Sequence, residues 1–489
     1  MSIKYDISYN WVPKHEAFPY QHEAFLALKD KPYAAVFHEQ GLGKTKIAID
    51  LLLYWLSSQA IDSVIVVTKK ILVNNWCEEF KEHTNLQTHV IGTSKGANFF
   101  VFNSPSRIII TNFETISNEK ARLKLFLKTR SVAVIIDESA KIKNPDSKLT
   151  KDFFELSPLF KIRLIMTGTP VANRPYDMWS QIFFLDRGEH LGTDFKAFKK
   201  ACDLSNDLFD DESKRASFEH ETASIFDKIR DFCVRETKQS GIISLPNKTY
   251  HELIVPFESR QQEMYDTIRE EMCIPIKKGD TTILDGSNET IKRLLRLLQV
   301  TSNPKLLDDQ YTVVSSKEAL LDKVINDIIA REEAAIIWSI YTDNIDYFCK
   351  KYKEHNAVKI TGKMSNEDRS RSVKLFKSGE AKLLFATPQS AKEGLTLTIA
   401  NNAIFYDRGF NLDDYLQAQD RIHRISQKHE CNIYNLMVAD SIDIWVDYLL
   451  KAKQEAAFLA QGDKTLELYR QQVDYSFSQI VRKILKLEE

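Results

Sequence analysis

The sequence lacks the marks of a disulfide scaffold, a zinc protein or a membrane protein. Its six cysteines are scattered without a Cys-x-x-Cys pair, which favours a reducing compartment. No apolar run approaches the length of a membrane helix, and residues 1–20 lack the apolar segment of a signal peptide. We therefore expect a soluble protein of the cytoplasm.

Neither sign of charge dominates the chain. The 67 Lys and Arg residues stand against 68 Asp and Glu residues, for a net charge of −1. No global electrostatic attraction for nucleic acid follows from this balance, although a basic groove on a neutral protein is compatible with binding. The 489 residues, of which 43% are hydrophobic, indicate a globular protein of about two to four domains.

Short apolar runs separated by helical patterns occur in two blocks. The first block has them at about residues 34–38, 64–68, 108–111, 132–136 and 162–166, and the second at about 335–339, 357–361, 382–386, 403–406 and 432–437. Such runs favour parallel sheets covered on both faces. We predict an α/β protein with two tandem lobes, 1–240 and 241–489. The first lobe is predicted to contain a helical insertion at about 190–235. The second is predicted to contain one at about 258–308 and a helical tail from about 451.

A glycine loop gives the strongest functional signal. Residues 38–45 read His-Glu-Gln-Gly-Leu-Gly-Lys-Thr, between an apolar run and a helical pattern. This context is typical of a phosphate-binding loop, in which Gly41 and Gly43 let the backbone amides turn toward phosphates at a helix N-terminus. Lys44 is predicted to reach the β- and γ-phosphates, and the Thr45 hydroxyl to hold Mg²⁺.

His38 departs from the general pattern of such loops, since many of them have Gly or Ala at this position. The alternative interpretation is a glycine-rich helix entry with an ordinary surface lysine. A second nucleotide motif downstream makes that alternative weaker.

This second motif is an apolar strand that ends in two acids, Asp137 and Glu138. Asp137 is predicted to bind the metal and Glu138 to orient or deprotonate the attacking water, because phosphoryl transfer needs both roles. Alone, an acidic pair after a strand is equally typical of a solvated strand end. Together with Lys44, it predicts ATP hydrolysis.

Two further segments belong with this predicted site. Thr-Gly-Thr-Pro at 167–170 would place hydroxyls beside the acidic motif, the alternative being a simple turn. Gln21, in Phe-Pro-Tyr-Gln at 18–21, is a candidate for reading adenine, although such a segment alone is more typical of a surface turn.

The second block carries its strongest signal at 417–427. Arg421 and Arg424 are three positions apart, which predicts that they share one face of a helix. A hydrolase whose nucleotide lies between two lobes needs arginines that stabilise charge on the γ-phosphate. Gln417 and Asp420 are predicted to orient these arginines or to contact the nucleotide. The alternative is an ordinary charged surface helix.

In their order along the chain, these motifs resemble those of the superfamily two helicases. The Swi/Snf-type branch is the most similar, because residues 64–76 end in Trp76 before two acids, and Lys-Ile-Lys-Asn at 141–144 follows the acidic motif. Ala140 and Thr361 stand where the family usually has His. The poorly glycine-rich segment 391–398 resembles the distant branch of annealing and fork-remodelling translocases.

The resemblance implies two RecA-like lobes, ATP and Mg²⁺ as cofactors, and DNA, duplex or branched, as the partner. It also implies contacts to the nucleic-acid backbone from lysines, hydroxyls and amides of both lobes. The candidates are Lys69, Lys70, Thr111, Asn112, Thr361 and Thr387. Each of them, taken singly, is as easily an ordinary surface residue.

The predicted function is a DNA-stimulated ATPase motor that translocates on duplex or branched DNA and remodels it by a helicase, branch-migration or annealing activity. Two alternatives stay open: a nucleotide-dependent clamp or scaffold in a larger defence or restriction complex, and an RNA-directed helicase. The clamp predicts loss of a catalytic residue, yet the predicted set is complete. The compact build favours a bacterial or phage-encoded protein. A protein partner would direct it to its site of action.

Overall fold

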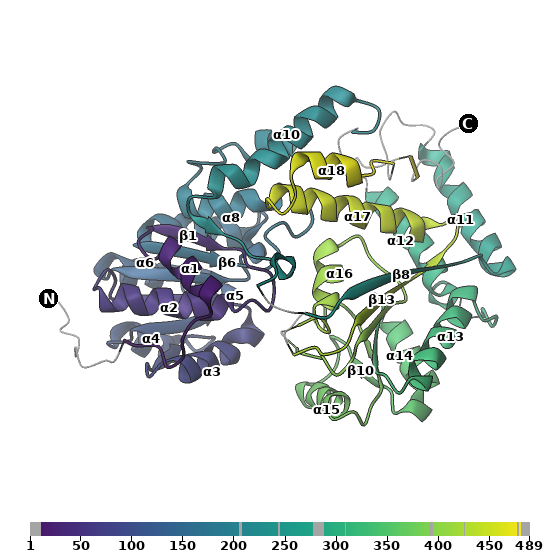
Figure 1. Cartoon of the computed structure of the whole chain (residues 1–489), viewed down its shortest axis with the longest axis horizontal. Coiled ribbons are helices and arrows are strands. Elements are labelled where there is room, and N and C mark those ends of the chain that lie inside the picture. Colours follow the sequence, from purple (N-terminus) through teal and green to yellow (C-terminus); the bar gives the residue numbers. More distant parts are fainter. Residues whose placement is uncertain are drawn as a thin grey trace. The chain divides into compact units, whose positions relative to one another are not determined.

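The computed structural model describes residues 11–204, 208–242, 245–276, 288–308, 310–390, 395–424, 426–476 and 479–480. Contacts along the chain divide it into two compact units (Figure 1). The first unit holds residues 1–203, 216–243 and 456–469, and the second holds residues 204–215, 244–455 and 470–489. None of the described helices is long and apolar enough to cross a membrane.

The described part of the first unit contains a parallel sheet of seven strands in the order β3-β4-β2-β5-β6-β1-β7. The strands are β1 (Tyr33–Val36), β2 (Ser63–Thr68), β3 (Thr88–Val90), β4 (Ile108–Asn112), β5 (Val132–Asp137), β6 (Ile162–Met166) and β7 (Cys233–Val234). The α-helices in this part of the chain are α1 (Pro19–Leu28), α2 (Lys44–Ser57), α3 (Val73–His83), α4 (Lys95–Asn103), α5 (Phe113–Asn118), α6 (Lys120–Thr129), α7 (Lys148–Leu156), α8 (Asp177–Asp186), α9 (Phe195–Ala201) and α10 (Glu212–Ile229).

The described part of the second unit contains a parallel sheet of six strands in the order β10-β11-β9-β12-β13-β8. The strands are β8 (Lys248–Val255), β9 (Ala335–Trp338), β10 (Val358–Ile360), β11 (Leu383–Ala386), β12 (Asn402–Phe405) and β13 (Cys431–Val438). The α-helices from here to the C-terminus are α11 (Ser259–Ile276), α12 (Asn288–Ser302), α13 (Ser316–Ala330), α14 (Thr342–Lys351), α15 (Asn366–Lys377), α16 (Leu412–Gln419), α17 (Ile442–Ala460) and α18 (Leu466–Gln472).

Two parallel sheets in tandem, with helical insertions, confirm the predicted α/β fold class. All ten predicted apolar runs coincide with strands, and five of these strands are wholly buried. The strands β3, β7 and β8 were not predicted, and each of them lies at an edge of its sheet. Edge strands are short or partly polar, because one side of each is not paired within the sheet. In β8, half-buried and exposed positions alternate along most of the strand, and no position is fully buried.

Each unit has its own apolar core. In the first unit, Leu52 and Trp55 of α2 are packed with Val66 and Ile135 of the sheet. In the second unit, α13 and α14 supply a comparable cluster that includes Ile325 and Phe348, packed with residues of β9 and β11. Burial of this kind contributes about 25 cal/mol per Å² of apolar surface, which makes it the main source of stability for both sheets.

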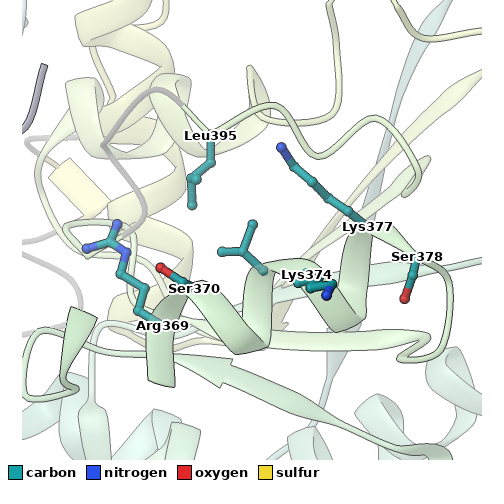
Figure 2. A pocket seen from close by; sticks show the side chains of 7 residues that line it. Arg369, Ser370, Lys374, Lys377, Ser378 and Leu395 are labelled. Carbon is teal, nitrogen blue, oxygen red and sulfur yellow. The ribbon is translucent and has the colours of Figure 1, made fainter. Parts of the chain in front are cut away.

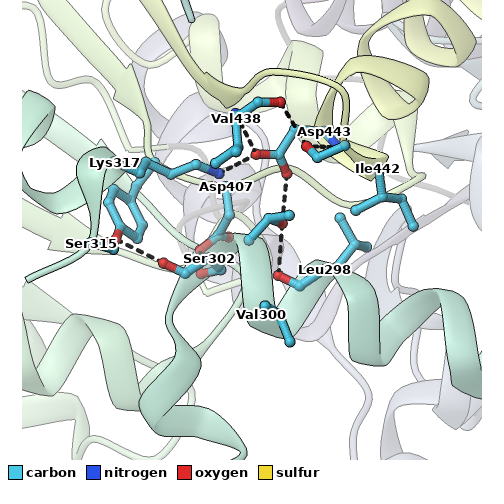
Figure 3. Close-up of polar contacts among 12 residues, drawn as sticks. Leu298, Val300, Ser302, Ser315, Lys317, Asp407, Val438, Ile442 and Asp443 are labelled. Carbon is cyan, nitrogen blue, oxygen red and sulfur yellow. Dashed lines mark hydrogen bonds and ion pairs between the residues drawn. The ribbon is translucent and has the colours of Figure 1, made fainter. Parts of the chain in front are cut away.

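A buried polar network holds the end of α12 in the second unit (Figure 3). The Lys317 ammonium is fully buried and pairs with Asp443, which also accepts a hydrogen bond of 2.9 Å from the Thr301 hydroxyl. Asp407 accepts a hydrogen bond of 2.6 Å from the Ser302 hydroxyl, and burial raises the pKa of its carboxyl. The last turn of the predicted insertion is therefore an integral part of this unit.

Replacement of Lys317 by alanine should destabilise the second unit strongly. The change leaves the buried Asp443 carboxylate without its cation, which costs about 3–5 kcal/mol in comparable pairs. The measurement is the melting temperature by calorimetry. Lys359→Ala is the control, because Lys359 pairs with Asp346 at the surface of the same unit, where a pair is worth about 1 kcal/mol or less. Equal losses in the two variants would contradict a special role for the buried pair.

Candidate functional site

Three predicted motifs follow three neighbouring strands of the first sheet. In the order β5-β6-β1, Met166 is paired in register with both Asp137 and Val36. Because these strands are parallel, the chain leaves all of them at the same edge of the sheet. The glycine loop, the acidic motif and the Thr-Gly-Thr-Pro turn therefore meet there.

The glycine loop has the backbone of a phosphate cradle. Gly41 and Gly43 have φ angles of +88° and +66°, in the left-handed region that favours glycine, and α2 begins at Lys44 directly after them. The Lys44 ammonium donates hydrogen bonds to the carbonyl oxygens of His38 and Glu39, at 3.0 and 3.3 Å. The Lys44 ammonium thus lies against the loop with which it is predicted to bind phosphates.

The start of α1 is packed on this loop. A Cβ atom added at Gly43 would lie 2.1 Å from the Gln21 Nε2 atom, so no side chain fits there without a shift of Gln21. The Gln21 Oε1 atom accepts a hydrogen bond of 2.9 Å from the Phe18 amide, and the Tyr20 hydroxyl donates one of 3.3 Å to the Leu42 carbonyl. Gln21 is therefore brought to the loop, and its contact with adenine stays a prediction.

The Thr-Gly-Thr-Pro turn also touches the loop, at a residue that the sequence did not single out. A Cβ atom added at Gly168 would lie 2.7 Å from Gln40 Cγ, 3.0 Å from the Gln40 amide nitrogen and 3.4 Å from Lys44 Nζ. Only glycine allows this close approach. The turn is therefore in direct van der Waals contact with the loop that carries Lys44.

Asp137 is held by two donors from the segment that follows β2. Its Oδ2 atom accepts hydrogen bonds from the Thr68 hydroxyl at 3.0 Å and from the Trp76 indole at 2.8 Å. Burial, and then the negative charge of Glu138, raise the pKa of Asp137 to about 6, while Lys44 lowers it in part. Among the described residues, no hydrogen bond reaches Oδ1.

Glu138 has a φ angle of +59°, which is uncommon for a residue with a side chain and marks local strain. Its Oε2 atom lies 3.8 Å from the Lys69 ammonium. Lys69 was predicted to contact nucleic acid, so the structure brings a candidate nucleic-acid residue together with a candidate catalytic one.

The residues present fit a magnesium–nucleotide complex. Thr45 lies in the first turn of α2 and Asp137 at the end of β5, and hydroxyl and carboxylate oxygens suit Mg²⁺. Mg²⁺ is usually bound by one or two protein groups plus phosphates and water. The described part of the chain contains no cluster of three or more His, Cys, Asp or Glu that could hold a metal ion.

A distant part of the first unit supports the strand that leads into the loop. Arg235 donates a hydrogen bond of 2.7 Å to the Phe37 carbonyl, and its other nitrogens bind both carboxylate oxygens of Asp463. The Glu39 amide donates to the Glu236 carbonyl at 2.8 Å. No local pattern in the sequence indicates the contact between Arg235 and Asp463, because 228 positions separate them.

The second unit contains Arg421 and Arg424, and the prediction that they lie on one face of a helix is wrong. Helix α16 ends at Gln419, and both arginines lie in the turns that follow. Side chains there take carbonyl oxygens that a continuing helix would need. Arg421 Nε donates to the Gln417 carbonyl at 3.0 Å, and Arg424 Nε to the Asp420 carbonyl at 2.9 Å.

Their surroundings hold these arginines in defined positions. Arg421 is 1% exposed, and Arg424 donates a hydrogen bond of 2.8 Å to the Thr396 hydroxyl. Burial lowers the pKa of the Arg424 guanidinium. Gln417 donates a hydrogen bond of 2.7 Å to Asp413, and Asp420 is buried. The roles of all four residues toward a nucleotide stay predictions.

The candidate nucleic-acid residues differ in exposure. Lys70 is exposed and Lys69 is half-buried. Thr111 is fully buried, and its hydroxyl donates to the Ile91 carbonyl at 3.1 Å. Asn112 is buried as well, with its Oδ1 atom accepting a hydrogen bond from the Thr115 amide at the start of α5. Thr111 and Asn112 therefore have structural roles that a sequence pattern does not reveal, and Thr111 has no surface to offer a phosphate.

In the second unit, Thr361 is 4% exposed, and the Thr387 hydroxyl donates to Ser390 at 2.8 Å. Next to this turn, Arg369 donates to the Ser390 carbonyl at 2.7 Å. Residues 391–394 of the predicted motif at 391–398 lie outside the described residues.

Sequence reasoning missed a basic hollow along α15 (Figure 2). This pocket of about 530 Å³ is lined by Arg369, Ser370, Val373, Lys374, Lys377, Ser378 and Leu395. The signal was present as cations at spacings of five and three along one helix. Its charge and shape suit phosphate groups.

Comparisons with known proteins agree with these motifs. The SNF2-related domain family matches residues 27–306, and the helicase conserved C-terminal domain family matches residues 316–426. An uncharacterized ATP-dependent helicase of Mycoplasma pneumoniae is 29% identical over 425 residues, which cover 85% of this chain and 39% of that protein. An ISWI chromatin-remodeling complex ATPase of Saccharomyces cerevisiae is 26% identical, with 85% of this chain and 37% of that protein covered. The chain thus spans about two fifths of the length of these relatives.

Among solved structures, the Sulfolobus solfataricus SWI2/SNF2 ATPase core in complex with dsDNA has a TM-score of 0.44 and 23% identity, covering 99% of this chain and 100% of that one.

His38 should make the first unit sensitive to acid. Burial, and secondarily the charge of Lys44, lower the pKa of its ring from 6.5 to about 4. Between these values the unfolded chain binds more protons, so stability is lost as the pH falls through this window. The expected loss between pH 7 and pH 5 is about 2 kcal/mol. Melting temperatures at both pH values test this, and His38→Ala should show a smaller drop than the unsubstituted chain. An equal drop would contradict the assignment.

Proposed function

The chain belongs to the SNF2-related family, and from that premise we propose that it is an ATP-hydrolysing motor that moves along DNA. The observation that carries the proposal is the meeting of three motifs at one edge of the first sheet. Lys44, Asp137 and Glu138 follow β1 and β5 there, with Gly168 in contact with the same loop. This is the set that phosphoryl transfer requires.

In the proposed reaction, the amides of the glycine loop and the Lys44 ammonium bind the β- and γ-phosphates. Thr45 and Asp137 would hold Mg²⁺, which when bound neutralises phosphate charge. Glu138 orients the attacking water and accepts its proton. Gln21 is proposed to contact the adenine, and its position against Gly43 supports a role in nucleotide binding.

Arg421 and Arg424 are proposed to stabilise the charge that develops on the γ-phosphate. A guanidinium offers several donors in a fixed plane, which suits phosphate oxygens. One feature supports this role, because both side chains are held in defined positions by carbonyl oxygens of their own segment. Gln417 and Asp420 supply those carbonyl oxygens and are proposed as positioning residues.

The proposed partner is the backbone of duplex or branched DNA. Lys69, Lys70 and Thr387 are kept as contacts, and the basic hollow that contains Arg369 and Lys374 extends the set in the second unit. These groups position a strand without reading its sequence. We also keep the proposals of a remodelling or annealing activity and of a bacterial or phage protein at work in the cytoplasm. Relatives in two Mycoplasma species support the bacterial part.

Two substitutions separate nucleotide binding from hydrolysis. Lys44→Ala should abolish ATP turnover and weaken ADP binding, whereas Glu138→Gln should lower turnover by about 10²-fold or more and leave ADP binding intact. Turnover by a phosphate-release assay and binding by calorimetry measure the two effects. Lys161→Ala is the control, because Lys161 is exposed and precedes β6 at the opposite edge of the sheet. Full turnover in Lys44→Ala would refute the site.

The second test is the ATP hydrolysis rate at one fixed salt concentration, without nucleic acid and with single-stranded, duplex, forked or four-way DNA, or with RNA. We expect the strongest stimulation from duplex or branched DNA. Salt must be fixed because phosphate contacts dominate affinity. Stimulation only by RNA would favour an RNA-directed helicase, and no stimulation at all would favour a nucleotide-dependent clamp.

A further inference from the structure

One segment of the first unit contacts both acids of the acidic motif. Thr68 at the end of β2 and Trp76 in α3 donate hydrogen bonds to Asp137 Oδ2, at 3.0 and 2.8 Å. Lys69, which follows Thr68 directly, lies 3.8 Å from Glu138 Oε2. The side chains of Lys69 and Glu138 are 29% and 17% exposed, so this ion pair is within reach of a ligand at the surface.

We propose that Lys69 is the positioning residue through which nucleic acid controls ATP hydrolysis. The inference rests on the proposed function, in which Glu138 orients the attacking water and Lys69 contacts a backbone phosphate. Without nucleic acid, the Lys69 ammonium pairs with the Glu138 carboxylate at 3.8 Å and holds that side chain in place. A backbone phosphate competes for the same ammonium through charge-assisted hydrogen bonds, and it leaves the Glu138 side chain free to turn toward the attacking water.

The contacts of the two acids differ in a way that suits this switch. Asp137 has two hydrogen bonds from buried groups, Thr68 and Trp76, neither of which depends on Lys69. Glu138 has the half-buried ion pair with Lys69 and a strained backbone with φ of +59°. Removal of Lys69 from its partner therefore frees the side chain of Glu138, while the candidate metal-binding acid keeps its position.

Lys70 provides a matched control at the adjacent position. It is exposed, and among the described residues no ion pair joins it to an acid. In the proposed function it contacts the same nucleic-acid backbone. Loss of Lys70 therefore removes one phosphate contact without any change at Glu138.

The experiment measures ATP hydrolysis with and without saturating duplex DNA for the unsubstituted chain, Lys69→Ala, Lys69→Arg, Lys70→Ala and Lys161→Ala. Lys69→Ala should raise the DNA-free rate by about two- to fivefold, the range that corresponds to one ion pair near the surface, and should lower the ratio of stimulated to DNA-free rates by the same factor. The KM for ATP should stay unchanged. Lys69→Arg keeps the charge and should keep the ratio, and Lys70→Ala should require more DNA for half-maximal stimulation. Lys161→Ala, at an exposed lysine outside the proposed site, should keep the DNA-free rate.

Three results would overturn the inference while leaving the proposed function intact. They are a DNA-free rate of Lys69→Ala at or below that of the unsubstituted chain, an equal effect of Lys69→Ala and Lys161→Ala on that rate, and a failure of Lys69→Arg to keep the ratio. If the unsubstituted chain hydrolyses no ATP, or responds to no DNA, the proposed function fails and the inference fails with it. The two failures are therefore distinguishable.

Discussion

The parallel pairing of β5, β6 and β1 is the constraint on which the candidate site depends. Each strand alone ends in a short polar segment with little chemical meaning. Side by side and in register, they bring the glycine loop, Asp137 and the turn at Gly168 to one edge of the sheet. Parallel strands need crossover connections, which in this chain are helices that supply the core. The same parallel sheet therefore aligns the residues of the site and, through its crossover helices, forms the core that stabilises them.

Close packing then limits which residues the site accepts. Gly43 leaves room for the Gln21 amide, and Gly168 leaves room for Gln40, in both cases at distances where a Cβ atom would collide. The absence of a side chain at these glycines lets neighbouring segments pack closely, in addition to any freedom that it gives the backbone. Lys44, between the two contacts, is positioned by neighbours on both sides and by the carbonyl oxygens of His38 and Glu39. An ordered cation of this kind reduces the reorganisation that phosphate binding would otherwise demand.

Sequence patterns predicted the central strands because continuous apolar runs are the direct result of burial on both faces. They did not predict β3, β7 and β8. These strands lie at sheet edges, where residues can pair with the neighbouring strand and still contact solvent. The local motif around Lys44 also predicted its own geometry, since glycine, helix start and lysine are adjacent in the chain. Thr111 shows where such reasoning ends. A hydroxyl near the end of a strand faces either solvent or the interior, and the hydrogen bond of Thr111 to the Ile91 carbonyl shows that it faces the interior. For Arg421 and Arg424, side chains that cap carbonyl oxygens ended a helix that the spacing had predicted to continue.

Residues 456–469 belong to the first unit, although they are synthesised long after its sheet. Arg235 cannot form its ion pair until Asp463, 228 positions later, has been made. Gly462 packs so closely against Phe226 that a Cβ atom at Gly462 would lie 2.6 Å from the ring. Folding of this unit on the ribosome therefore cannot be completed as its strands emerge. Until Asp463 has been translated, the Arg235 guanidinium, which contacts the Phe37 carbonyl just before the glycine loop, has no carboxylate partner from that segment. Closure over such a long separation is slow compared with local pairing, so the Asp463 contact that fixes Arg235 beside the glycine loop forms only after residues 456–469 have been made.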